Sequence, residues 1–220
     1  MGKKVVVAGR GMPGKEEELY TLYDDGTWLL RDVRGSYVHV GKMYQGPPDR
    51  DTGKVPAPKY TFTAILENEK HARAIKLLER EIRKLLTANG FKADEDVKAD
   101  FKALRNGNLS GKSEYKNAWT VNMSERENRP PALRGINGER IDREHMGDVK
   151  IDNMFVSGFY FDVLGKLWYQ KDYGRKVNAN LLAVKVNRKG ETFGEGGISD
   201  DDVDDVFGVS GDTGGFDGDL

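Results

Sequence analysis

Cysteine is absent from the 220 residues of this chain. Disulfide frameworks, thiolate metal sites and cysteine nucleophiles are therefore excluded together, and a reducing compartment is compatible with the sequence. No stretch approaches the ~20 apolar residues that a membrane-spanning helix needs, and the N-terminus lacks the apolar core of a signal peptide. We therefore expect a soluble protein of the cytoplasm that makes no membrane contact.

Histidine is scarce as well, and the sequence has it at only three positions, His39, His71 and His145. None of the three belongs to a zinc-ligand spacing such as His-Glu-x-x-His. Asp49, Glu114 and Lys116 have the residue types of a nuclease site, but such pairs are common in a chain with 32% charged residues. We therefore expect no metal, no cofactor and no enzymatic activity.

Charge is abundant and unevenly distributed. The segment from Glu195 to Leu220 holds nine carboxylates and no Lys or Arg, although the whole chain has 35 basic and 36 acidic residues. Without this tail the body keeps 27 acidic residues and carries a net charge of +8. A basic body with an acidic tail is typical of proteins that bind a polyanion and that mask the binding site or recruit partners.

Most of the body has the pattern of β-strands. The segment from Lys59 to Leu66 alternates clearly: Tyr60, Phe62, Ala64 and Leu66 face a core, and Lys59, Thr61 and Thr63 face water. A loop with four prolines, 45–58, precedes it. The further predicted strands cover residues 28–43, 115–123, 149–163, 167–173 and 178–186.

One clear helix follows the alternating strand. Asn68 is a plausible N-cap, an apolar stripe runs from Ala72 to Leu86, and Gly90 ends the helix. A shorter helix is expected at 94–104. One dominant helix among five or more strands predicts a mainly β protein, a small antiparallel barrel with an inserted helix; a doubly wound fold would need alternating helices.

The N-terminal glycines match two nucleotide-binding motifs incompletely. Gly9, Gly11 and Gly14 have the dinucleotide spacing, but no βαβ unit follows them. A phosphate-binding loop ending at Lys15 would need Ser or Thr next, and the sequence has Glu16 there. The simpler interpretation is a strand, a glycine turn and a second strand that extend the body.

Aromatic residues alternate with Lys and Arg over much of the body, which is the combination that single-stranded nucleic acid requires. Bases stack on aromatic rings while cations neutralise phosphates. We assign Phe155, Phe159, Phe161 and Val163 to the core by their period of two. The candidate DNA contacts from this pattern are Arg34, Tyr37, Lys42, Tyr44, Lys59, Tyr160, Lys166, Trp168, Tyr169, Lys171, Tyr173, Arg175 and Lys176.

Residues 33–194 resemble the bacteriophage single-stranded-DNA-binding proteins that carry an OB fold, and an acidic tail with Phe207 and Phe216 completes the likeness. Residues 1–30 fall outside it, and the chain ends in Leu220 rather than an aromatic residue. The matching stretches, which add Arg105 and Lys116 to the candidate contacts, are residues 58–66, 104–108, 114–119, 129–133 and 178–184.

The resemblance implies an OB-like antiparallel five-stranded barrel that binds single-stranded DNA without sequence preference. Such proteins coat and protect single strands during phage replication, recombination and repair in the bacterial cytoplasm. We expect an N-terminal β extension (1–30), an OB domain (31–194) and a disordered acidic tail (195–220). A homodimer is compatible with this organisation.

For the tail we expect two roles: its carboxylates compete with DNA for the groove, and once displaced it recruits replication proteins such as a polymerase or a helicase-primase. The candidate tail residues are Asp200, Asp201, Asp202, Asp204, Asp205, Phe207, Phe216 and Leu220. Two alternatives stay open, an RNA-binding protein or nucleic-acid chaperone, and a nucleotide-binding enzyme that uses residues 9–15.

Overall fold

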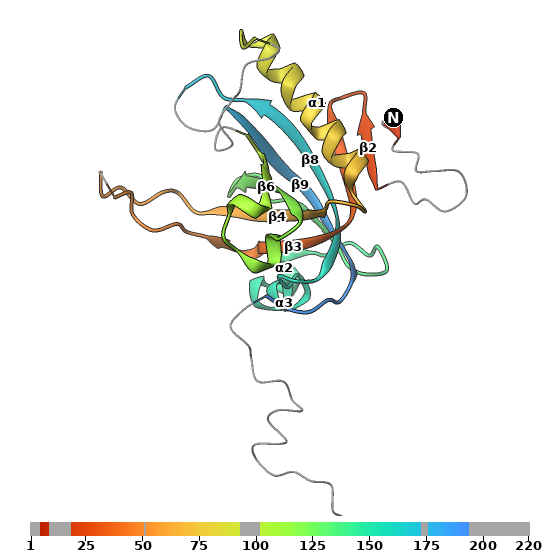
Figure 1. Ribbon diagram of the computed structural model, residues 1–220. Helices are drawn as coiled ribbons and strands as arrows, with labels where there is room; N and C mark the ends of the chain where they lie inside the picture. The colour runs from red at the N-terminus through yellow and green to blue at the C-terminus, as the bar shows by residue number, and fades with distance from the viewer. Residues whose placement is uncertain (1–4, 9–18, 51, 93–101, 173–175, 194–220) are drawn as a thin grey trace, which may run out of the picture.

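The computed structural model describes residues 5–8, 19–50, 52–92, 102–172 and 176–193 (Figure 1). Strands take up more of this part of the chain than helices do, and its α-helices are α1 (Ala72–Ala88), α2 (Arg143–Met146) and α3 (Asp148–Met154). The strands are β1 (Val5–Ala8), β2 (Tyr20–Tyr23), β3 (Thr27–Tyr44), β4 (Lys59–Glu67), β5 (Leu104–Asn106), β6 (Ala118–Arg126), β7 (Ala132–Arg134), β8 (Tyr160–Tyr169) and β9 (Val177–Arg188).

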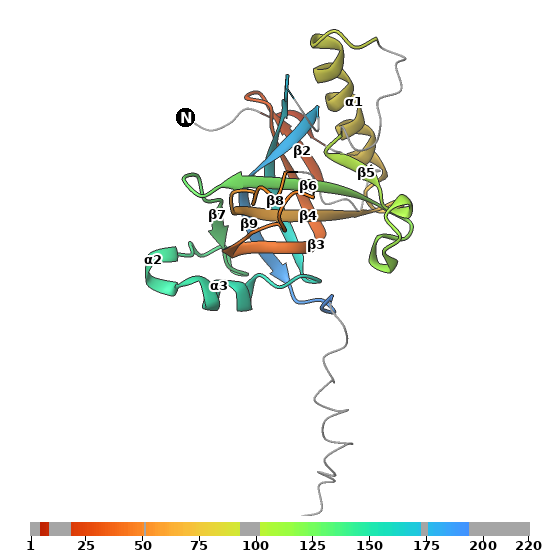
Figure 2. The ribbon, with the colours of Figure 1, turned by 90° about the vertical axis from the view of Figure 1, so that its left-hand side faces the viewer.

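Five of these strands close into a barrel. β3 pairs with β4, β4 with β6, and β9 with β8, which returns to β3; all four pairings are antiparallel. The circle is completed by a short parallel pairing of β6 with β9, between Ser124 and Asn180. This is the strand arrangement of an OB fold, with α1 inserted between β4 and β6 and α2 and α3 between β6 and β8 (Figure 2). The predicted OB-like fold is confirmed.

Strand β3 is long because it belongs to two halves of the barrel. Its first part, Thr27 to Arg34, pairs with β8, and its second part, Arg34 to Tyr44, pairs with β4. The register shifts near Asp32 and near Tyr37, and both residues have a φ of 49°. Such bulges re-aim the side chains of a strand and increase its bend.

The barrel interior is apolar and closely packed. The rings of Phe62 and Phe161 meet edge to face with centroids 5.2 Å apart. A Cβ at Gly35 would lie 2.6 Å from the Phe161 ring, so this position of β3 requires glycine. The predicted core face of β4 is confirmed, since Tyr60, Phe62, Ala64 and Leu66 are all buried.

Helix α1 packs against β4, β8 and β9 with the predicted apolar stripe. Ile75, Leu78, Ile82 and Leu86 are buried, whereas Ala72 at its start is exposed. The prediction of Asn68 as N-cap is wrong, because a turn separates β4 from the helix and His71 takes the cap position.

His71 is itself buried and joins the start of α1 to two strands. Its Nδ1 accepts a hydrogen bond from the amide of Glu67 (3.1 Å), and its Nε2 lies 3.4 Å from the carbonyl oxygen of Arg31. Burial and the nearby charge of Lys70 lower the pKa of His71. The ring is therefore a neutral part of the fold.

Three predicted segments differ from the structure. The strand expected at 149–163 is helix α3 followed by the start of β8, because Gly147 and Gly158, with φ of 75° and 105°, bracket a helical turn that buries Ile151. The strand expected at 167–173 is the end of β8, which continues through Gly165. Tyr115 lies in a 3₁₀ turn before β6 rather than in a strand.

The other predicted elements agree with the structure where it describes them. β3, β4 and β9 match the strands expected at 28–43, 59–66 and 178–186 within a few residues. Most of the helix expected at 94–104 lies outside the described residues, and its last residue, Leu104, begins β5.

The N-terminal region adds strands to the barrel sheet. β1 pairs with β2 and β2 with β3, which confirms the predicted β extension. Tyr20–Tyr23 is a strand, not part of the helix that a nucleotide-binding motif needs, and the motif at residues 9–16 lies outside the described residues, as does the tail from 194. None of the described helices has the length and apolar character needed to cross a membrane.

Candidate nucleic-acid interface

The outer face of β4 and β6 forms the floor of a groove of about 410 Å³. The polar side of β4 lies here, and Lys59, Thr61 and Thr63 all line the groove. The prediction that Thr63 faces water is wrong, because this residue is buried at the groove floor. The Thr63 hydroxyl hydrogen-bonds to Oδ1 of Asn122 on β6 (2.9 Å). The other lining residues are Tyr37, Tyr44, Arg105, Asn106, Leu109, Ser110, Tyr115, Thr120, Met123 and Ser124.

A second cavity of about 650 Å³ continues the first one. The two share Lys59 and Ser124, so together they form one path across β4 and β6 toward β9. The second cavity is further lined by Ala57, Pro58, Glu125, Arg126, Glu127, Asn128, Arg129, Trp168, Asn178 and Asn180. We call the combined path the groove.

The bulge in β3 turns Tyr37 into the groove. Its φ of 49° is unusual for a residue with a side chain, and the hydroxyl of Thr61 donates a hydrogen bond to its carbonyl oxygen (3.0 Å). The ring is 45% exposed. The Lys112 ammonium lies 4.4 Å from the ring centroid and hydrogen-bonds to the Tyr37 hydroxyl, which raises the pKa of Lys112. The Tyr37 ring is therefore fixed in position and partly exposed on the groove surface.

The second cavity has its own exposed aromatic side chain. Trp168 near the end of β8 is 39% exposed and lies opposite Asn178 of β9 in the strand register. On the β6 side, the buried carboxylate of Glu125 accepts a hydrogen bond from the Arg126 amide and pairs with the Arg129 guanidinium, both at 3.0 Å. This carboxylate holds Arg129, whose side chain is 61% exposed, at the cavity.

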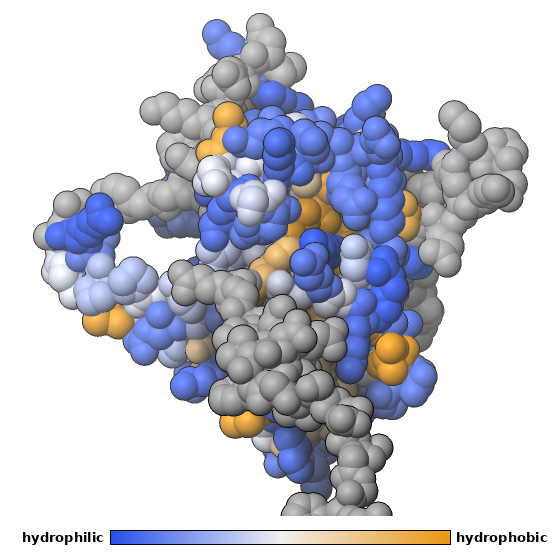
Figure 3. Space-filling model, turned by 60° about the horizontal axis from the view of Figure 1, so that its bottom comes forward, coloured by the Kyte–Doolittle hydropathy of each residue, from blue (hydrophilic) through white to orange (hydrophobic). Residues whose placement is uncertain are grey.

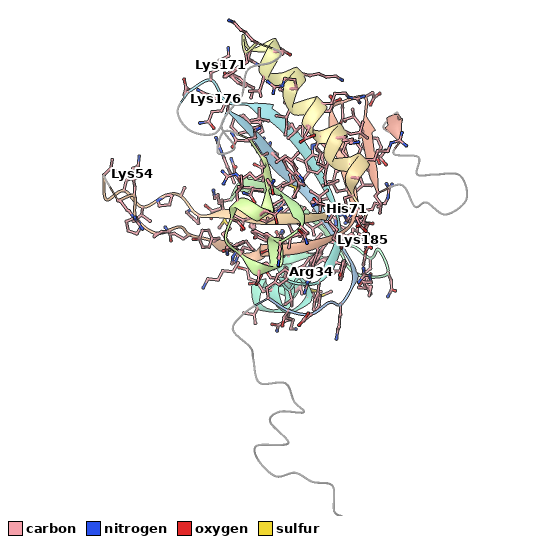
Figure 4. The ribbon with its side chains drawn as sticks, in the orientation of Figure 1. Arg34, Lys54, His71, Lys171, Lys176 and Lys185 are labelled. Atoms are coloured by element: carbon pink, nitrogen blue, oxygen red, sulfur yellow. The ribbon has the colours of Figure 1, made fainter. Side chains whose placement is uncertain are left out.

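Two loops carry further lysines on the same side of the molecule. Figure 4 shows Lys54 at the tip of the arm between β3 and β4, and Lys171 and Lys176 in the loop between β8 and β9. The arm stands clear of the body in Figure 3. Cations at these tips and on the groove floor suit a chain of phosphates, and the rings of Tyr37, Tyr44 and Trp168 suit its bases.

Comparison with known proteins agrees with this geometry. The family model described as the ssDNA-binding protein of Enterobacter phage Enc34 matches residues 28–213. The chain belongs to this family. No curated protein sequence matches it.

Solved structures of the Enc34 protein share the fold. The single-stranded DNA-binding protein from bacteriophage Enc34 is 23% identical, with a TM-score of 0.68 over 91% of this chain and 98% of its own. A structure of the same phage protein in complex with ssDNA is 24% identical, with a TM-score of 0.68 over 83% of this chain and 97% of its own.

The predicted contact residues divide into those that line the groove and those that do not. Tyr37, Tyr44, Lys59, Arg105 and Trp168 meet in the groove although they come from β3, β4, β5 and β8. Lys166 is exposed on the same face of β8 as Trp168 but does not line a cavity.

The remaining predicted residues lie elsewhere or make internal contacts. Arg34 donates to the carbonyl oxygens of Gly158 (3.1 Å) and Glu191 (2.6 Å) and lies over the Phe193 ring. The Tyr160 ring lies under the Arg188 guanidinium at 3.3 Å, and Tyr169 packs edge to face against Phe91. Lys42 and Lys116 are exposed outside the groove, and Tyr173 and Arg175 lie outside the described residues, as do all the candidate tail residues.

Sequence reasoning missed several groove residues. Thr61 and Thr63 were recognisable as the polar face of β4, but their short side chains carried no functional signal. Asn106 ends β5 and Leu109 lies in the 3₁₀ turn after it, and the pairing of β5 with β6 places both at the groove. Asn178 and Asn180 alternate along β9, and the barrel closure brings them there.

Proposed function

We propose that this protein binds single-stranded DNA along the groove, without sequence preference and without catalysis. The observation that carries the proposal is the convergence of Tyr37, Tyr44 and Trp168 with Lys59 and Arg126 on one continuous surface. Family membership and the DNA-bound structure of the Enc34 protein support it.

The chemistry of the two kinds of side chain fits an unpaired strand. Each base that stacks on an aromatic ring contributes about 1–3 kcal/mol, and rings accept every base because each has a π-face. Lys and Arg neutralise phosphates and release counterions, so binding weakens with salt. Both contributions are independent of sequence.

We propose that the protein coats single strands during phage DNA replication, recombination and repair in the host cytoplasm. Residues 31–194 form the binding domain and residues 1–30 its β extension. The acidic tail, 195–220, competes with DNA for the basic groove and, once displaced, recruits proteins such as a polymerase or a helicase-primase. The support for the tail roles is its nine carboxylates on a chain whose body has a charge of +8.

A salt-titrated binding measurement tests the central proposal. Fluorescence anisotropy with labelled ssDNA, duplex DNA and ssRNA of equal length is expected to give a strong preference for ssDNA and a steep salt slope. Equal affinity for duplex DNA would refute the proposal, and a preference for ssRNA would identify an RNA-binding protein instead.

Deleting residues 195–220 tests the masking role of the tail. The shortened protein is expected to bind ssDNA more tightly, most clearly at low salt, because the competing carboxylates are gone. Unchanged affinity at every salt concentration would refute masking while leaving the binding proposal intact.

A further inference from the structure

Leu109 is the most exposed large apolar side chain that the structure describes, at 76%, and yet it lines the groove. Single exposed leucines are common and need no explanation by themselves. This one differs because of its place: it shares its cavity with Tyr37 and Tyr44, the two aromatic residues most suited to stack on a base.

The loop that carries Leu109 is tightly built. The Asn106 side chain accepts a hydrogen bond from the amide of Asn108 (3.0 Å), and the Asn108 side chain accepts one from the amide of Asn117 (2.9 Å). The Ser110 hydroxyl donates to the carbonyl oxygen of Gly107 (2.7 Å). These side-chain contacts close the turn on itself and fix the position of Leu109 between them.

The same loop is attached to the groove floor and to the bulge in β3. A Cβ at Gly107 would lie 2.3 Å from the Tyr115 carbonyl oxygen, which shows how closely the loop packs. The buried Tyr115 hydroxyl donates to the Ser36 hydroxyl (2.9 Å), and Lys112 contacts Tyr37. The loop that carries Leu109 and the β3 bulge that carries Tyr37 are therefore in direct contact.

We propose that Leu109 and Tyr37 together grip one unstacked base and so help the protein distinguish single strands from duplex DNA. The proposal rests on the proposed function and adds a specificity residue to it. An unpaired base can leave its neighbours and place one face on the ring and its edge against the leucine. A paired base is stacked on both sides and must first be extruded from the helix, which costs free energy.

The test compares Leu109→Ala with Val149→Ala, a control that trims a 75% exposed valine on α3, away from the groove. Binding is measured with oligo-dT, with an abasic strand of equal length and with duplex DNA. Leu109→Ala is expected to weaken oligo-dT binding about fivefold, because a partly covered leucine loses its contact with the base. Affinity for the abasic strand and for duplex should not change.

A second variant guards against an indirect effect of the loop. Leu109→Phe keeps an apolar surface and is expected to bind oligo-dT at least as tightly as the native chain. Equal affinity of the native chain and Leu109→Ala for oligo-dT, or an equal loss on the abasic strand, would overturn the role of Leu109. Failure of the native chain itself to bind oligo-dT would instead refute the proposed function.

Discussion

Among the described tyrosines that lie beside a cation, Tyr37 and Tyr160 occupy different parts of the barrel. Tyr37 lines the groove with Lys112 beside its ring, whereas Tyr160 does not line the groove and the Arg188 guanidinium lies 3.3 Å from its ring centroid. Each pair has an acidic neighbour, but at a different distance. The Glu114 carboxylate lies 4.0 Å from the Lys112 ammonium, whereas Asp32 accepts hydrogen bonds from Lys70 and, at 3.3 Å, from Arg188. The same residue types therefore lie at the proposed DNA groove in one place and form an internal network in the other.

The two pairs therefore differ in how closely a carboxylate binds the cation, since only Asp32 is hydrogen-bonded to its cations. Asp32 lies at the bulge in β3, has a φ of 49° and contacts Lys70 and Arg188, the two cations beside the Tyr160 ring. Burial opposes its ionisation, but the hydrogen bond and charge of Lys70, with those of Arg188, outweigh this and lower the pKa of Asp32. Asp32 is thus charged at neutral pH, and Lys70 and Arg188 are both paired with it.

Removing the aromatic rings of the groove should have the largest effect. The double variant Tyr37→Ala, Trp168→Ala is expected to lower ssDNA affinity about 100-fold, because each ring supports roughly 1–3 kcal/mol of stacking. Fluorescence anisotropy at constant salt measures the loss. Tyr160→Ala is the control outside the groove and should bind ssDNA as the native chain does. A comparable loss of affinity in this variant would contradict the assignment of DNA binding to the groove.

Removing the carboxylate should affect stability instead of binding. Asp32→Asn keeps a residue that tolerates positive φ and leaves Lys70 beside Arg188 without a counter-charge. We expect about 1–2 kcal/mol less stability in urea unfolding, a modest value because the groups are partly exposed. Since the folded-state pKa is lowered, this contribution is present above about pH 4 and is lost as pH falls further. A clear loss of ssDNA affinity in Asp32→Asn would show that the Asp32 network also takes part in DNA binding.

The buried His71 predicts a second pH dependence, at higher pH. Its folded-state pKa lies below the usual value of 6.5, so the unfolded chain takes up a proton first as the pH falls. Urea unfolding is expected to show roughly 1 kcal/mol lower stability at pH 5.5 than at pH 7.5. His71→Asn should remove part of this difference, while substitution of the exposed His145 by Gln should leave it; the reverse result would refute the assignment.

The smallest expected effect concerns a single phosphate contact. Lys59→Gln should weaken ssDNA binding severalfold and reduce the slope of log affinity against log salt by about 0.7, the value for one phosphate on a single strand. Lys185→Gln, away from the groove (Figure 4), should change neither. An unchanged slope for Lys59→Gln would remove this residue from the DNA path.

Local patterns in the sequence predicted much of the fold. The alternation of Tyr60, Phe62, Ala64 and Leu66 predicted β4 correctly, and the stripe from Ile75 to Leu86 predicted α1. Both signals come from the residues of one element that face the same core. The apolar pattern at 149–163 was misread, because Ile151 and Phe155 also fit one side of a helix, four residues apart.

The groove was predicted only in part, since it is made by contacts between distant segments. Lys59, Ser124 and Asn180 meet through strand pairing, and nothing local in the sequence places them together. The cation and aromatic pattern found Tyr37 and Trp168, but it also selected Arg34 and Tyr160, whose internal partners lie more than 20 residues away in the chain. Whether such partners occupy a side chain depends on the tertiary fold, which local sequence does not show.

The length of β3 has a consequence for how the molecule comes apart. At one end of this strand, Trp28 pairs with Leu22 of β2 on one edge and with Gly165 of β8 on the other. At the other end, Tyr44 lines the groove. Separating the β2 extension from the barrel removes hydrogen bonds from the same strand that closes the barrel against β8. Extension and barrel should therefore unfold as a single cooperative unit, and amide hydrogens of both should exchange with solvent through the same opening.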